Sequence, residues 1–105
     1  MKKAFIEKER KQGQQIEVGM GATGSYWTDA YAYEVVRVVS DKTVEIRRLD
    51  VVRKEGTDWL DEEYDYFSND ENPVERVRRC KTGWKTKHGM KVRFGHAQEY
   101  RDPCL

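Results

Sequence analysis

Four side chains in the C-terminal half of the chain have the chemistry of zinc ligands. Cys80, His88, His96 and Cys104 follow one another at intervals of eight residues, and they are all the cysteines and histidines of the 105 residues. Structural zinc sites usually take ligand pairs two to four residues apart, and this chain has no such pair. We therefore expect free thiols, separate imidazoles and no metal or other cofactor, with a shared metal site as the alternative.

Paired carboxylates offer a second kind of chemistry, general acid and base catalysis. Asp61, Glu62, Glu63 and Asp65 lie within five residues. Such catalysis needs a cleft that drives two carboxyl pKa values apart, whereas a dense acidic run is usually a solvated loop. We therefore expect a protein without enzymatic activity.

The glycines at positions 19, 21 and 24 match the spacing of a dinucleotide-binding loop. That loop works because a helix begins directly after it and receives the pyrophosphate at its N-terminus. The residues that follow here, Ser25 to Asp29 and then a valine-rich segment, leave no room for a helix. We expect 19–24 to be a turn after a short strand at Gln15 to Val18, with positive φ at one or more glycines.

Opposite charges are separated along the chain. Residues 55–75 contain nine acidic side chains and no basic one, and residues 76–93 contain eight basic side chains and no acidic one. The net charge of +1 hides this separation. Cations that alternate along strands beside Trp84 and Phe94 are typical of small barrels that bind nucleic acid, because cations neutralise phosphates and aromatic rings stack on bases. The residues predicted to bind nucleic acid or an acidic partner are Arg76, Arg78, Arg79, Lys85, Lys87, Lys91 and Arg93.

The acidic segment has the complementary character. Its carboxylates alternate with large aromatic side chains, a combination that steers a protein toward a basic groove and provides anchors for a pocket. The alternative is an acidic surface loop whose apolar residues pack on the core. The residues predicted to bind a protein partner are Asp58, Trp59, Asp61, Glu62, Glu63, Tyr64, Asp65 and Tyr66.

Five or six short strands without helical periodicity predict a mainly β fold. Residues 33–39 and 43–49 are rich in β-branched side chains and predict a hairpin, in which Val44 and Ile46 share the buried face and Val36 and Val38 face the core. Residues 74–80 predict a third strand. Residues 84–87 and 90–94, on either side of His88 and Gly89, predict a last hairpin. We expect a small antiparallel barrel or a strongly bent sheet, SH3-like or OB-like.

The chain length fits a single domain over residues 1–105. Residues 1–12 predict a helix or an arm, and residues 55–73 predict a long acidic connection between the halves of the barrel. No apolar run approaches the roughly 18 residues that span a bilayer, and no signal peptide is recognisable. We therefore expect a cytosolic protein without membrane contact.

Two stretches of the chain resemble a group of small bacteriophage and prophage proteins of unassigned activity. The first stretch carries Gly19-x-Gly21-Ala22-Thr23 and the Thr28-Asp29 turn, followed by a valine-rich strand, and the second ends in Tyr100-x-Asp102-Pro103. The resemblance implies action inside an infected bacterium. Our leading expectation is a phage accessory protein that binds and inhibits a host or anti-phage defence protein, such as a CRISPR nuclease. The alternative is a nucleic-acid-binding barrel that uses residues 76–93.

Overall fold

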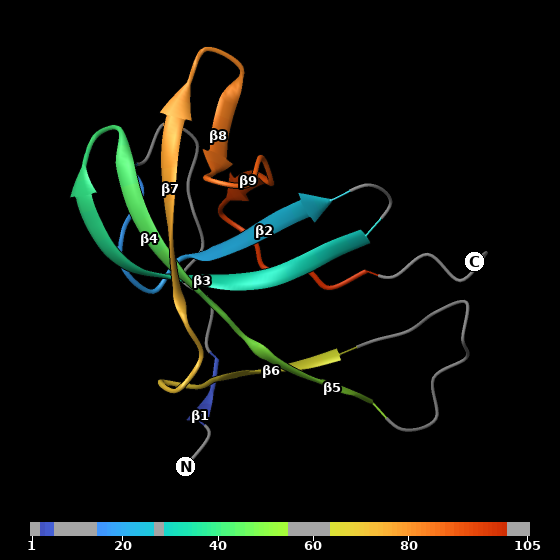
Figure 1. The fold of residues 1–105 in the computed structure, drawn as a ribbon. Coiled ribbons are helices and arrows are strands. Elements are labelled where there is room, and N and C mark those ends of the chain that lie inside the picture. Colours follow the sequence, from blue (N-terminus) through green and yellow to red (C-terminus); the bar gives the residue numbers. More distant parts are fainter. Residues whose placement is uncertain (1–2, 6–14, 27–28, 55–63, 101–105) are drawn as a thin grey trace.

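The computed structural model describes residues 3–5, 15–26, 29–54 and 64–100, and these ranges contain two antiparallel sheets (Figure 1). A closed barrel has the strand order β2-β3-β4-β7-β8-β9, and a smaller sheet has the order β1-β6-β5. The predicted small antiparallel barrel is therefore confirmed. Within the described ranges, no helix is long and apolar enough to cross a membrane. The strands are β1 (Lys3–Ala4), β2 (Gly21–Tyr26), β3 (Asp29–Ser40), β4 (Thr43–Arg48), β5 (Asp50–Arg53), β6 (Tyr64–Ser68), β7 (Val74–Cys80), β8 (Gly83–Thr86) and β9 (Lys91–Phe94).

The valine-rich hairpin forms as predicted, but one assignment of its faces is wrong. Strands β3 and β4 pair in antiparallel fashion, and Val44 and Ile46 are both buried in the barrel. Val36 and Val38 were predicted to face the core, but Val36 is only half-buried and Val38 is 40% exposed, whereas Val35 is only 1% exposed. The pairing register shifts between Val35 and Arg37. Because such a bulge exchanges the two faces of a strand, the alternation read from the sequence fails at this point.

The glycine-rich segment is mostly a strand, not the predicted turn. Gly19 has a positive φ of 92° and precedes the sheet, but residues 21–26 form β2 and pair with both β3 and β9. No strand forms over Gln15 to Val18. A Cβ atom on Gly24 would lie 2.6 Å from the Sδ and Cε atoms of Met90. This glycine therefore serves close packing inside the barrel, which is the other common reason for glycine in a strand.

The three strands of the basic half lie where the sequence predicts them. Strand β7 covers residues 74–80, and β8 and β9 form a hairpin on either side of residues 87–90. Met90 and Val92 are buried in the barrel core, and Trp84 and Phe94 are half-buried against it. The β8–β9 hairpin closes the barrel because β9 also pairs with β2.

Residues 55–73 were predicted to form a long acidic connection. Part of this segment instead forms β6 of the second sheet. Strands β5 and β6 pair from Asp50 opposite Phe67 to Arg53 opposite Tyr64. Strand β1 pairs with β6, so Lys3 and Ala4 are part of a sheet and not of a predicted helix or arm; residues 6–12 lie outside the described residues. Figure 1 shows this sheet at the opposite end of the molecule from the β7–β8 turn.

A second, smaller core joins the β1-β6-β5 sheet to the barrel. Ala32 of β3, Leu49 between β4 and β5, and Ala97 near the C-terminus are each buried to at least 96%. Phe5, Val51 and Tyr66 pack against them from the second sheet. The aromatic and β-branched residues of β5 and β6 therefore bury one face of that sheet, and its acidic residues stay on the surface.

Candidate nucleic-acid interface

Three cations form a row across the outer surface of the barrel. In the pairing register, Arg78 of β7 lies opposite Lys85 of β8, and Lys85 lies opposite Lys91 of β9. Residues directly opposite each other on antiparallel strands share a face. Val77, next to Arg78, is completely buried, so the row itself faces outward.

Arg93 extends this row along β9. It lies two residues beyond Lys91, on the same side of the strand, and it is exposed. We define the basic face by these four residues, which come from three adjacent strands about 4.8 Å apart. The members of the basic face are Arg78, Lys85, Lys91 and Arg93.

Within the described residues, no carboxylate neutralises the cations of the basic face. Among the residues that the structure describes, none of the four has an acidic partner within ion-pair distance. Arg76, one row away, differs because its Nη2 lies 3.2 Å from the Oε2 of Glu45. The positive charge of the basic face is therefore open to a partner, and that of Arg76 is largely balanced.

The remaining predicted cations lie beside the basic face. Lys87 is exposed in the β8–β9 turn. Arg79 pairs across the strands with Trp84 and alternates with Arg78, so its side chain leaves β7 on the opposite side. Its backbone N–H donates to the carbonyl of Lys42 at 2.9 Å, which ties β7 to the β3–β4 turn.

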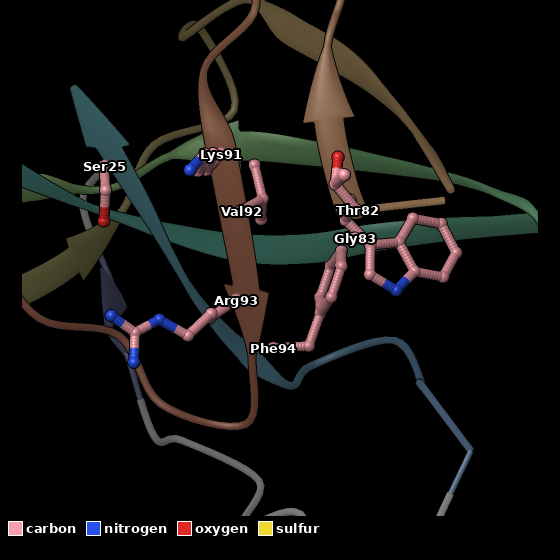
Figure 2. Close-up of a pocket in the computed structure, with 8 residues that line it drawn as sticks. Ser25, Thr82, Gly83, Lys91, Val92, Arg93 and Phe94 are labelled. Atoms are coloured by element: carbon pink, nitrogen blue, oxygen red, sulfur yellow. The ribbon is translucent and has the colours of Figure 1, made fainter. Parts of the chain in front are cut away.

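A hollow of about 520 Å³ opens beside the basic face. Figure 2 shows β9 crossing it, with Ser25 and Arg93 on one side of the strand and Thr82 and Phe94 on the other. The rings of Trp84 and Phe94 meet edge to face, with their centroids 5.2 Å apart and an interplanar angle of 78°. The hollow is lined by Ser25, Thr82, Gly83, Trp84, Lys91, Val92, Arg93 and Phe94.

Sequence reasoning missed Ser25 and Thr82 as lining residues. Ser25 lies opposite Lys91 only because β2 closes the barrel against β9. Ser25 and Lys91 are 66 positions apart in the sequence, and nothing in the local pattern of either strand predicts their pairing. Thr82 lies in the β7–β8 turn, whose position was predictable but whose approach to β9 was not.

The acidic segment predicted to bind a protein lies largely outside the described residues. Asp58, Trp59, Asp61, Glu62 and Glu63 fall in that part, so their role stays a prediction. The other three residues begin β6. Tyr64 is half-buried and Asp65 is exposed, 3.8 Å from the Nζ of Lys54. The hydroxyl of Tyr66 accepts a hydrogen bond from the backbone N–H of Glu99 at 2.9 Å, a structural contact.

The candidate zinc ligands do not gather into a site within the described part of the chain. There, no three side chains of His, Cys, Asp or Glu lie close enough together to hold a metal ion. Cys104 lies outside the described residues. The Sγ of Cys80 lies 3.5 Å from the Oγ1 of Thr82 and donates to the carbonyl of Gly83 at 3.0 Å. Hydrogen bonds from the side chain and backbone of Thr82 lower the pKa of the Cys80 thiol.

Comparisons with protein-family models, with curated proteins and with solved structures found no match for this chain. The resemblance to small bacteriophage proteins therefore stays a prediction that depends on the quoted motifs alone.

Proposed function

We propose that this protein binds nucleic acid through the basic face. The observation that carries the proposal is the row formed by Arg78, Lys85 and Lys91, three cations from three adjacent strands without an acidic partner among the described residues. Like charges at this spacing repel one another, so the folded barrel gains nothing from keeping them together. A phosphate backbone provides the regularly spaced negative charge that relieves this repulsion.

The basic face and the carboxylates near the second sheet lie in different parts of the molecule, and this separation orients the protein as it approaches a nucleic acid. Asp50, Asp65, Asp70 and Glu71 belong to the second sheet or to the turn that follows it, and Figure 1 shows that sheet at the end opposite the β7–β8 turn. A polyanion attracts one end of such a molecule and repels the other. Arg53 and Lys54 at the same end offset these four carboxylates only in part. The basic face therefore meets the nucleic acid first.

The strength of binding should depend steeply on salt. Each phosphate contact with a cation of the basic face releases condensed counterions. Four such contacts give a slope of log K against log salt concentration of about −3 on a single strand and about −3.6 on a duplex. Binding of this type is largely independent of base sequence, because phosphate contacts carry no sequence information.

The test is a charge reversal with a matched control. Arg78→Glu combined with Lys85→Glu should weaken binding of a labelled oligonucleotide about 100-fold in fluorescence anisotropy and flatten the salt slope. Arg53→Glu combined with Lys54→Glu makes the same change in net charge on exposed residues at and just after the end of β5. That control should stay within about threefold of the wild type at moderate salt, where distant charges are screened. Equal losses in both variants, or no binding by the wild type, would overturn the proposal.

The alternative, an inhibitor of a host or defence protein, is distinguished from a nucleic-acid-binding protein by comparing the basic-face reversal with a reversal in the acidic segment. An inhibitor that acts through the acidic segment should lose its target when Asp61→Lys and Glu63→Lys are combined, and it should keep it when the basic face is reversed. A pull-down from bacterial lysate, with and without nuclease treatment, distinguishes a protein partner from nucleic acid.

A further inference from the structure

We propose that the hollow beside β9 binds an unpaired base, so that this protein prefers single-stranded to duplex nucleic acid. The inference rests on the proposed function, because the basic face must first hold the phosphate backbone. It adds a second kind of contact, aromatic stacking, in a hollow that Lys91 of the charged row also lines.

The barrel core holds the rings of Trp84 and Phe94 in place. Trp84 and Phe94 both pack against the barrel core, which includes Val92 between them in the sheet. In an edge-to-face pair only one ring turns its face to the other, so the ring that presents its edge keeps its own faces for other contacts. Both rings are half-buried and not fully covered. A rigid and partly exposed aromatic pair is what base stacking requires.

The hollow joins directly to the phosphate-binding cations. Lys91 and Arg93 belong to the basic face and also line the hollow. Along β9 the side chains of Lys91 and Arg93 alternate with those of Val92 and Phe94, so the cations and the rings lie on opposite faces of the strand and share only the lining of the hollow. A nucleic-acid strand held by Lys91 and Arg93 therefore reaches the rings only where one of its bases enters the hollow. In a duplex the bases are paired and stacked on one another, so their faces are not available to stack on the two rings. Only an unpaired base makes both contacts.

Ser25 adds a polar group at the rim of the hollow. Its hydroxyl has no hydrogen-bond partner among the described residues, whereas the Thr23 hydroxyl, two residues earlier on β2, donates to the carbonyl of His96 at 2.6 Å and accepts from the N–H of Gln98 at 3.1 Å. A hydroxyl both donates and accepts, so Ser25 can bond the polar edge of any base. A volume of about 520 Å³ lies within the roughly 300–1,000 Å³ of small-molecule sites and accommodates a group the size of a nucleoside.

The experiment compares three probes with the full-length protein: a single strand of about 12 thymidines, its abasic counterpart with the same phosphates, and a duplex of the same length. We expect the thymidine strand to bind about 5- to 150-fold more tightly than the abasic strand, the range that one stacked base gives. Trp84→Leu should reduce that ratio to about twofold or less and leave the abasic affinity unchanged. Arg78→Glu with Lys85→Glu should weaken all three probes.

Trp84→Leu can also destabilise the barrel, so a second measurement keeps the inference testable. In a chain carrying Trp27→Phe and Trp59→Phe, Trp84 is the remaining tryptophan. Its emission should be quenched by the thymidine strand and not by the abasic strand. Equal affinity for all three probes, without selective quenching, would overturn the inference and leave the proposed function standing. Failure to bind any probe would overturn both.

Discussion

Arg48 and Glu99 form an ion pair, 2.9 Å between Nη2 and Oε2, in which the carboxylate is completely buried. Both side chains also hold the backbone of Ala32: the Nη1 of Arg48 donates to its carbonyl at 2.9 Å, and the Oε1 of Glu99 accepts from its N–H at 3.1 Å. The guanidinium lies over the ring of Tyr31, 5.1 Å from its centroid. Together with the hydrogen bond from Glu99 to Tyr66, the pair ties the barrel to the second sheet.

Removal of the Glu99 carboxylate should destabilise the fold. We expect Glu99→Ala to lower the free energy of unfolding by about 3 kcal/mol, because it leaves the partly buried Arg48 without its counter-charge. Glu99→Gln should cost less, since its amide oxygen can still accept the Ala32 N–H. Urea unfolding measures both. The control, Glu71→Ala on an exposed turn, should stay within about 0.5 kcal/mol of the wild type; equal losses would mean that the pair does not stabilise the fold.

A methyl group at position 24 should be poorly tolerated. The Cβ of Gly24→Ala would lie 2.6 Å from the side-chain end of Met90 and 2.9 Å from the Cε2 of Tyr33, both of which are buried. Overpacking of this kind costs roughly 1–3 kcal/mol. Thermal unfolding of the variant tests this, with Ser25→Ala in the same strand as the control. Met90→Val removes the nearest atoms, so in the double variant the two losses should not add.

The stability of the protein should fall between pH 10 and 12 because of Tyr33. Burial, reinforced by the nearby Glu75 carboxylate, raises the pKa of the Tyr33 hydroxyl to about 12. In the unfolded chain a tyrosine ionises near pH 10, so between these values the folded state holds a proton that the unfolded state has lost. The free energy of unfolding therefore decreases as the pH rises through this window. Tyr33→Phe should show a shallower decrease, and a parallel dependence in the two proteins would contradict the assignment.

The Cys80 thiol should react faster than an ordinary exposed thiol at neutral pH. Its pKa is lowered by hydrogen bonds from Thr82, and the thiolate is the reactive species. The measurement is the rate of reaction with a disulfide reagent in a Cys104→Ser variant, in which Cys80 is the remaining cysteine. Thr82→Val removes the side-chain hydrogen bond and should slow the reaction near neutral pH. An unchanged rate would show that the hydroxyl does not influence the thiol.

The barrel strands were predictable because their signals are local. The β-branched runs of β3 and β4 and the turn at Gly89 specify hairpins whose partners are adjacent in sequence. The pairing of Lys85 with Lys91 follows from the predicted β8–β9 hairpin. The pairing of Arg78 with Lys85 depends on the β7–β8 hairpin, which the sequence analysis did not predict.

The features that sequence reasoning missed depend on contacts between distant segments. The second sheet pairs β1 with β6 across more than 60 residues, and the acidic run that leads into β6 hid the aromatic pattern of that strand. Glu99 looks like a surface residue until Arg48 is known to lie beside it. A bulge near Val36 and a strand role for Gly24 are likewise decided by neighbouring strands and not by local propensity.

The β5–β6 hairpin leaves the barrel and returns to it at nearly the same point, because Arg47, at the end of β4, is already paired with Val74, at the start of β7. The hydrogen-bond ladder of the barrel therefore closes without the segment between them. The bonds of Asn72 to Asp50 and to the carbonyl of Arg48, together with the second core, anchor this hairpin to the barrel. The barrel thus forms a closed scaffold to which β5 and β6 are added at a single point.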